Sequence, residues 1–118
     1  MGASLTLYPV KHYRQMEMEA ELAFRLDDDR ELFRSIWNLP QTPLKTTFGF
    51  FRKSIETGRM EREERKVDDC GRLLHWVYVR DLMKLEPLIH PVDTRTKYAF
   101  DVMKELPEYW PIVLYWSV

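Results

Sequence analysis

Cys70 and His75 are the two residues whose types could support covalent chemistry or metal binding. Cys70 is the only cysteine of the chain, and Asp68 and Asp69 come directly before it. A thiol, an imidazole and carboxylates can ligate zinc, and a thiol beside a base can act as a nucleophile. Thiol-based zinc sites normally show paired spacings such as Cys-x-x-Cys, however, and no glycine-bearing oxyanion motif accompanies this pair. We therefore expect no catalytic, metal-binding or cofactor-binding residue, and keep a small enzyme using His75, Cys70 and nearby carboxylates as the second alternative.

An acidic segment begins at Glu17. Glu17, Glu19 and Glu21 occupy alternate positions, and three consecutive aspartates follow at 27–29. On a strand such glutamates point the same way, about 6–7 Å apart, which suits acid–base chemistry or cation binding but is also typical of a solvated sheet face. We favour the solvated face. We expect the surface of residues 17–31 to engage a basic partner, or to mimic a nucleic acid toward a protein that binds one.

A basic and aromatic segment covers residues 48–66. Its cations follow three phenylalanines, and aromatic side chains beside cations can stack bases and contact phosphates. Four glutamates lie between the cations and cancel much of the positive field. We therefore favour a solvated segment whose charges pair with one another, and keep nucleic-acid binding as the first alternative. The cations of this segment that we expect to contact a partner are Arg59, Arg62 and Arg65.

Tyr109 and Trp110 form an aromatic pair between Pro107 and Pro111, where a predicted helix turns into a predicted strand. Exposed tyrosine and tryptophan side chains are frequent anchors at protein interfaces. The alternative, which we slightly favour, is that the pair covers the end of the core. Both residues remain candidates for contact with a partner.

Two predicted elements position the acidic segment. Six apolar residues at alternate positions predict a half-buried strand over residues 16–26, although the same residue types also suit a helix. Asp28 as N-cap with Glu31 three positions later predicts a helix that ends before Pro40. The apolar stripe of that helix is Leu32, Phe33, Ile36 and Trp37.

Aromatic and β-branched runs predict further strands over residues 46–53, 72–79 and 112–116. The last run is apolar throughout, which predicts a strand covered on both faces at the centre of the sheet. Residues 59–66 contain one apolar residue in eight and suit a solvated loop, a fraying helix or an edge hairpin.

The remaining predicted elements are helical. A short helical piece is expected over residues 81–85, and Asp93 or Thr94 can cap the second main helix. The spacing of apolar residues along that helix traces a single face. This face consists of Tyr98, Ala99, Val102, Met103 and Leu106.

Length and composition limit the classes of function. The 118 residues are 45% hydrophobic and 14% aromatic, which suits one folded domain and is too apolar for a disordered chain. The net charge of −1 argues against nucleic-acid binding, since neutralising phosphates needs a basic excess. No apolar run approaches the roughly 20 residues that span a bilayer, so we expect no membrane partner. One cysteine cannot form an intrachain disulfide, so we expect a cytoplasmic location.

The predicted fold class is α+β. We expect one domain over residues 1–118, with a mostly antiparallel sheet of four or five strands and two main helices packed on one face. Because no assembled catalytic or cofactor signature is present, we expect a small non-enzymatic interaction or regulatory protein. It would dock onto a protein partner or onto a second copy of itself.

Overall fold

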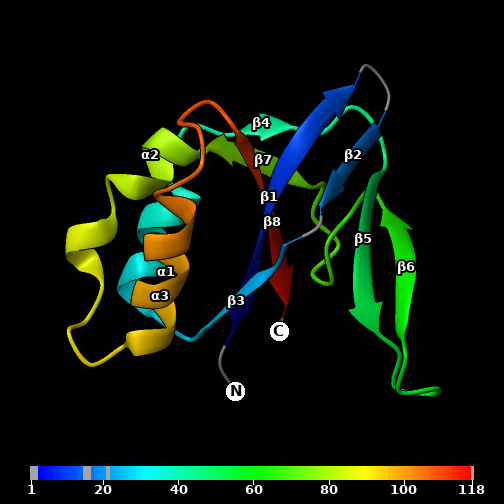
Figure 1. The fold of residues 1–118 in the computed structure, drawn as a ribbon, viewed down its shortest axis with the longest axis horizontal. Coiled ribbons are helices and arrows are strands. Elements are labelled where there is room, and N and C mark those ends of the chain that lie inside the picture. The colour runs from blue at the N-terminus through cyan, green and yellow to red at the C-terminus, as the bar shows by residue number, and fades with distance from the viewer. Residues whose placement is uncertain (1–2, 15–16, 21, 118) are drawn as a thin grey trace.

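The structure, a computed structural model, describes residues 3–14, 17–20 and 22–117, of which 11–14 and 17–20 are described as backbone alone. It shows the predicted α+β fold, a mostly antiparallel sheet with helices beside it (Figure 1). The helices are α1 (Arg30–Trp37), α2 (Val79–Met83) and α3 (Thr94–Met103), with a 3₁₀ turn at Glu86–Leu88. The strands are β1 (Ser4–Arg14), β2 (Glu17–Ala20), β3 (Phe24–Asp27), β4 (Thr42–Pro43), β5 (Phe48–Lys53), β6 (Met60–Arg65), β7 (His75–Tyr78) and β8 (Pro111–Ser117).

The described residues form a sheet of eight strands rather than the predicted four or five, in the order β4-β7-β8-β1-β2-β5-β6 with β3 paired to β1 outside this path. Within the predicted strand over 16–26, of which residues 16 and 21 lie outside the described residues, β2 and β3 are separate strands that pair with different halves of the long strand β1. The register of β1 with β2 shifts between Val10 and His12. Residues 59–66 contain the edge strand β6, one of the three possibilities that the sequence left open. The described pairings are antiparallel apart from that of β2 with β5.

Helices α1, α2 and α3 lie on the same side of the sheet (Figure 1). Asp29, rather than the predicted Asp28, is the N-cap of α1, and its carboxylate accepts a hydrogen bond from the Leu32 backbone N–H. Asp93 caps α3 in the same way, accepting from the Thr96 N–H. A carboxylate at this position satisfies an otherwise unpaired N–H and interacts favourably with the helix dipole.

The core between the helices and the sheet is mainly aliphatic. Two aromatic side chains predicted to face it are instead largely exposed, Trp37 at 51% and Tyr98 at 67%. Phe100, which the predicted face of α3 omitted, is fully buried. Trp37 is covered in another way, because the Arg72 guanidinium lies 3.9 Å from the centre of its ring. This helix-side core includes Leu5, Leu7, Leu26, Leu32, Ile36, Val77, Leu82, Phe100, Met103, Ile112 and Leu114.

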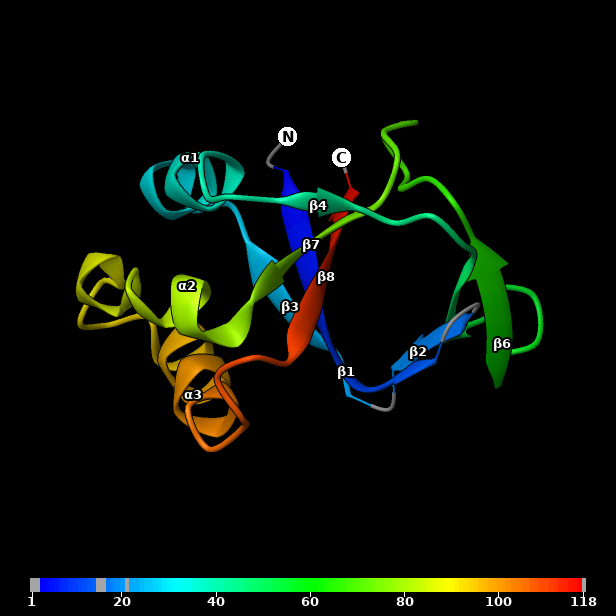
Figure 2. The same cartoon turned by 90° about the horizontal axis from the view of Figure 1, so that it is seen from above.

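The sheet curls, with β1 bending round toward β2 and β6 (Figure 2). Phe48 and Phe50 of β5 pack against Tyr8 of β1, and Phe50 also packs against Tyr115 of β8. An isolated bridge between Val67 and Leu73 also joins the chain after β6 to the chain before β7. The interior of the curl is a second core with several aromatic rings in contact. This hairpin-side core consists of Tyr8, Val10, Leu44, Phe48, Phe50, Leu74, Val113 and Tyr115.

Strand β8 belongs to both cores. Ile112 and Leu114 are buried in the helix-side core, and Val113 and Tyr115 are buried in the hairpin-side core. Since successive side chains of a strand point to opposite faces, a run without polar residues requires cover on both. The structure confirms the predicted central strand, which lies between β7 and β1.

Candidate functional site

The hairpin of β5 and β6 carries the basic and aromatic segment. The strands pair from Phe48 with Arg65 to Lys53 with Met60, and Gly58 in the turn has a φ of 69°, which favours glycine. Directly opposite residues of an antiparallel pair point to the same face. The inner face, toward the hairpin-side core, carries Phe48, Phe50, Arg52, Glu61, Glu63 and Arg65, and the outer face carries Gly49, Phe51, Lys53, Met60, Arg62 and Glu64.

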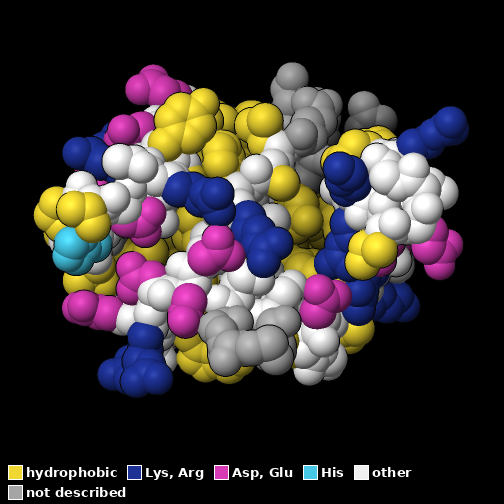
Figure 3. Space-filling model, turned by 90° about the horizontal axis from the view of Figure 1, so that it is seen from below, with side chains coloured by type: hydrophobic (Ala, Val, Ile, Leu, Met, Phe, Trp, Pro, Cys, Tyr) yellow, Lys and Arg dark blue, Asp and Glu magenta, His cyan; other side chains and the backbone are white. Residues whose placement is uncertain are grey.

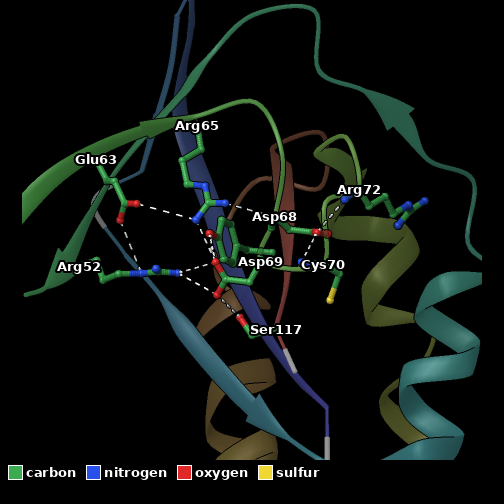
Figure 4. A network of polar contacts seen from close by, with 9 residues as sticks. Arg52, Glu63, Arg65, Asp68, Asp69, Cys70, Arg72 and Ser117 are labelled. Carbon is green, nitrogen blue, oxygen red and sulfur yellow. Dashed lines mark hydrogen bonds and ion pairs between the residues drawn. The ribbon is translucent and has the colours of Figure 1, made fainter. Parts of the chain in front are cut away.

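Asp69 is the centre of a polar network on the inner face (Figure 4). Its carboxylate accepts hydrogen bonds from the hydroxyls of Tyr115 at 2.7 Å and Ser117 at 2.9 Å, both on β8. It also accepts hydrogen bonds from the guanidinium groups of Arg65 at 2.9 Å and Arg52 at 3.2 Å. One carboxylate in the turn after β6 therefore joins both strands of the hairpin to β8.

The two arginines of this network are held from several sides. Glu63 lies between them, 3.6 Å from Arg52 and 3.8 Å from Arg65. Both guanidinium groups also lie over the Tyr115 ring, at 5.2 and 5.5 Å from its centre. With Asp69, the network contains two cations and two anions. It is therefore balanced in charge and is not an anion-binding cradle.

The network changes the acidity of its members. Partial burial opposes ionisation of Asp69, but hydrogen bonds from Tyr115 and Ser117 and the charges of Arg52 and Arg65 outweigh it, so the pKa of Asp69 lies below its ordinary value. Burial, together with the hydrogen bond to Asp69, raises the pKa of Tyr115 well above its ordinary 10.0. At neutral pH the site therefore holds a carboxylate and a neutral phenol, an arrangement that fixes structure and does not favour proton transfer.

Asp68 shapes the turn that carries Asp69. Its side chain is almost fully buried, and its Oδ1 accepts hydrogen bonds from the backbone N–H groups of Cys70 at 2.9 Å and Arg72 at 3.0 Å. Its Oδ2 is buried and has no hydrogen-bond partner within the described part of the chain. A carboxylate that accepts from the backbone after it stabilises a tight turn. We attribute the position of Asp69 to this turn.

Cys70 and His75 have different surroundings. Desolvation and the charges of Asp68 and Asp69 raise the pKa of the Cys70 thiol, which disfavours the reactive thiolate. The Nδ1 atom of His75 lies 2.7 Å from the Leu73 carbonyl oxygen. In the part of the chain that the structure describes, no three His, Cys, Asp or Glu side chains gather as metal ligands would.

The outer face of the hairpin presents apolar side chains to solvent. Phe51 is 49% exposed, Met60 is 62% exposed and Ile55, in the turn, is fully exposed. Phe51 lies directly opposite Arg62, and Met60 lies directly opposite Lys53. Two apolar and two cationic side chains therefore alternate across adjacent strands. We call Phe51, Lys53, Ile55, Met60 and Arg62 the outer patch.

The surroundings of the outer patch are shaped by a glycine. The Arg62 guanidinium donates a hydrogen bond to Glu64 at 2.6 Å, and a Cβ atom at Gly49 would lie 2.6 Å from its Nη2 atom. Gly49 thus leaves room for this ion pair.

A depression of about 490 Å³ follows the hairpin along residues 52–56 and 61–63. Seen from below, hydrophobic side chains lie in a hollow with Lys and Arg side chains along its right-hand rim, the side of the hairpin (Figure 3).

The three cationic candidates all belong to the hairpin but have different settings. Arg59 lies in the turn, Arg62 on the outer face and Arg65 in the inner network with Asp69. Phe51 and Met60 were not among the residues predicted to contact a partner. The signal in the sequence was the alternation of side-chain direction along the predicted strand over residues 46–53. It places Phe51 on the face opposite to Phe48 and Phe50, which are buried.

The remaining candidates lie elsewhere. Tyr109 is 71% exposed before β8, while Trp110 packs against the helix-side core. Glu17 and Glu19 belong to β2, but their side chains, like the whole of Glu21, lie outside the described residues. The structure therefore brings the cationic candidates together on one element and leaves the aromatic pair apart from them.

The described helices include none that is long and apolar enough to cross a membrane. Comparisons with models of protein families, with curated proteins and with solved structures found no match. The function must therefore be inferred from the hairpin and from the network that holds it.

Proposed function

We propose that this protein is a non-enzymatic interaction protein that docks onto a partner protein through the outer patch. One observation carries the proposal: Phe51, Ile55 and Met60 are exposed beside cations on a single hairpin. Clustered large apolar side chains in contact with water mark binding surfaces, because covering them is favourable. Met, Phe and Arg are also enriched at protein interfaces.

The inner network supports this role by holding the hairpin in place before a partner binds. Asp69 connects Arg52 on β5 and Arg65 on β6 to Tyr115 on β8. A surface that is already ordered avoids part of the entropic cost of association. The inner face thus fixes the hairpin to the body of the domain, while Phe51 and Met60 on its outer face are exposed.

The chemistry of the outer patch indicates its partner. Lys53 and Arg62 lie beside the apolar side chains, and Arg59 adds a third cation in the turn. Complementary interfaces place opposite charges around an apolar centre. We therefore expect the partner surface to be an apolar groove with acidic side chains at its rim.

The non-enzymatic part of the proposal is supported by the surroundings of the only thiol. The raised pKa of Cys70 makes it a poor nucleophile at neutral pH. As an exposed, unpaired thiol, it also supports a reducing compartment. We propose the cytoplasm.

Capture from the native cell with three baits tests the proposal. The baits are the wild type, the outer-patch variant Phe51→Ser/Met60→Ser, and the control Val92→Ser/Tyr98→Ser. The control removes two side chains that are 77% and 67% exposed on the helical side. We expect one protein to be captured by the wild type and the control but lost from the outer-patch variant, with circular dichroism showing that all three baits fold. Equal capture by all three baits would contradict the proposal.

Binding of single-stranded nucleic acid is the second candidate, favoured by the position of Phe51 opposite Arg62 on an exposed face. An aromatic ring can stack on a base while the cation contacts the phosphate. Fluorescence polarisation with a labelled RNA or DNA oligonucleotide at increasing salt measures this directly. Affinity that falls steeply with salt and is lost in Phe51→Ser supports nucleic-acid binding, and no affinity at low salt rejects it.

A further inference from the structure

The outer edge of β6 is a second surface of the hairpin, distinct from the outer patch. Among the described strands, β6 pairs with β5 and ends the sheet path. It lies at the margin of the molecule, on the side of β5 away from β2 (Figure 1). The edge of a sheet presents N–H and C=O groups that can pair with another strand.

The alternation of hydrogen-bonded and non-hydrogen-bonded pairs along the hairpin shows which residues of β6 present these groups at the outer edge. The Ser54 N–H donates to the Arg59 carbonyl at 2.8 Å, so this pair is a hydrogen-bonded one. Such pairs alternate along an antiparallel ladder. The main-chain groups of Glu61, Glu63 and Arg65 therefore point toward β5.

The main-chain N–H and C=O groups of the alternate residues of β6 point away from β5. The carbonyl of Lys66 accepts a hydrogen bond from Leu74, on the side away from β5, in agreement with this phase. The N–H and C=O groups of Arg62 and Glu64 consequently point outward from the sheet. Pairing with a second strand is limited to residues 61–65, because the edge at Lys66 is already occupied by Leu74.

We infer that β6 pairs antiparallel with β6 of a second copy of this chain, with Glu63 at the centre of symmetry. In this register Arg62 lies opposite the second copy's Glu64, and Glu61 lies opposite its Arg65. The outward main-chain groups of residues 62 and 64 form the hydrogen-bonded pairs. Arg62 and Glu64 are already an ion pair within one chain, so the two copies place four charges of alternating sign in a square.

Charge selects this register over its neighbours. A shift of the centre to residue 62 places Arg62 opposite itself and Glu61 opposite Glu63. A shift of the centre to residue 64 places Glu64 opposite itself and Arg62 opposite Lys66. Like charges directly opposite each other destabilise a strand pair. The charged edge thus opposes indiscriminate pairing while permitting one arrangement.

The one like-charge contact in the inferred register is Glu63 with its copy. Within each chain Glu63 lies 3.6 Å from Arg52 and 3.8 Å from Arg65. These cations offset the repulsion between the two carboxylates. Because only five residues of each strand overlap, we expect a weak dimer whose population depends on concentration.

This pairing extends the proposed function. A two-fold axis perpendicular to the sheet places the two outer faces on the same side, so that the two outer patches form one larger surface. The edge and the outer patch share Arg62, but Phe51 and Met60 supply none of the charges or outward main-chain groups of the inferred pairing. Removing Phe51 and Met60 is therefore expected to leave the dimer intact, and either proposal can fail while the other holds.

Charge reversal tests the pairing. Sedimentation should show wild-type dimers, while Arg62→Glu and Glu64→Arg are each monomeric at the same concentration. An equimolar mixture of the two single variants should form heterodimers, because each new charge then lies opposite its complement in the other chain. A wild type that stays monomeric at the highest soluble concentration, single variants that still dimerise, or a mixture that stays monomeric would each overturn the inference.

A disulfide tests the register independently. In a Cys70→Ser background, Glu63→Cys places two thiols directly opposite each other in the dimer, at a spacing that suits a disulfide. Glu61→Cys is the matched control, because its thiol lies opposite Arg65 of the second copy. Under mild oxidation we expect covalent dimers from Glu63→Cys at least several-fold faster than from Glu61→Cys. Equal rates would overturn the register.

Discussion

The two faces of β8 are packed in different ways. On the helical side, fifteen of the described residues, from three helices and four strands, are buried in a mostly aliphatic core. On the hairpin side, eight of the described residues are buried in the core, and four of them are the aromatic residues Tyr8, Phe48, Phe50 and Tyr115. The smaller core is supplemented by the polar network of Asp69. One face is therefore held by apolar packing, and the other by aromatic packing together with hydrogen bonds.

This difference places the larger core on the side of β8 away from the proposed docking surface. The helix-side core contains more buried apolar residues among those described, and burial of apolar surface dominates folding stability. The hairpin is buried at Phe48 and Phe50, and Arg52 and Arg65 connect it to Asp69, which binds β8. Regions with few buried contacts open at lower free energy than the core. A docking element fits this side of the molecule, because changes there affect the domain least.

The largest effect is expected from Leu114→Ala on the helical face of β8. Leu114 is 1% exposed, and removing a buried leucine side chain costs about 2–5 kcal/mol of the free energy of unfolding. Urea denaturation measures the loss. The control Tyr98→Ala truncates an exposed side chain of the same side and should change stability by less than about 0.5 kcal/mol. Similar losses in both variants would show that the helix-side core does not dominate stability.

Asp69→Asn tests the contribution of the polar network on the hairpin side of β8. The variant keeps the size of the side chain but removes the charge that binds Arg52, Arg65 and the Tyr115 hydroxyl. We expect a loss of about 1–3 kcal/mol, with faster amide exchange in β6 than in α3.

The matched control for this variant is Asp27→Asn. Asp27 also contacts two arginines, Arg25 at 3.2 Å and Arg95 at 2.9 Å, but its side chain is 54% exposed. Exposed ion pairs contribute at most about 1 kcal/mol. If the two asparagine variants lose the same stability, then the hydroxyl contacts of Asp69 add nothing to its ion pairs.

Some helices and strands could be predicted from the sequence, whereas others depended on contacts between residues distant in the sequence. The apolar run of β8 and the capping aspartates of the helices are local signals, and they gave a correct central strand and two correct helices. The alternation over residues 16–26 identified extended backbone but not its division, because pairing of β2 and β3 with two parts of β1 depends on contacts distant in sequence. Trp37 fitted an apolar stripe, but it lies at the surface under Arg72, again a distant residue.

The polar network could not be predicted from the spacing of residues in the sequence. Asp69 lies 46 residues from Tyr115 and 48 from Ser117 along the chain. Its partners converge only because the sheet curls and brings the end of β8 against the inner face of the hairpin. The spacing of residues along the sequence contained no information about which side chains Asp69 would meet.

A dependence on pH follows from the same network. The folded state raises the pKa of Tyr115, mainly through burial, so the phenol ionises more readily in the unfolded chain. Stability from this group is therefore complete below about pH 10 and declines as the pH rises above the ordinary pKa. We expect urea denaturation between pH 9 and about 11 to show a steeper decline for the wild type than for Tyr115→Phe. The exposed-residue control Tyr109→Phe should keep the wild-type slope, and a shared slope for all three proteins would contradict this assignment.

The smallest effect is expected from Glu86→Gln on the helical side. Lys104 Nζ lies 2.6 Å from a Glu86 carboxylate oxygen, a shorter contact than the 3.2 Å between Arg52 and Asp69. On distance alone, the ion pair of Lys104 and Glu86 would therefore be expected to contribute more to stability than that of Arg52 and Asp69. Both of its side chains are more than 40% exposed, however, so water competes for each charge and salt screens them.

Glu86→Gln should accordingly leave the free energy of unfolding unchanged within the error of urea denaturation, in low salt as in high salt. Asp69→Asn should lose stability in both, because the hydrogen bond from the Tyr115 hydroxyl is partly buried and does not depend on attraction between two full charges, so salt screens it less. A clear loss for Glu86→Gln at low salt would show that surface ion pairs also hold the helical side. The contrast between packing on one face of β8 and polar contacts on the other would then have to be abandoned.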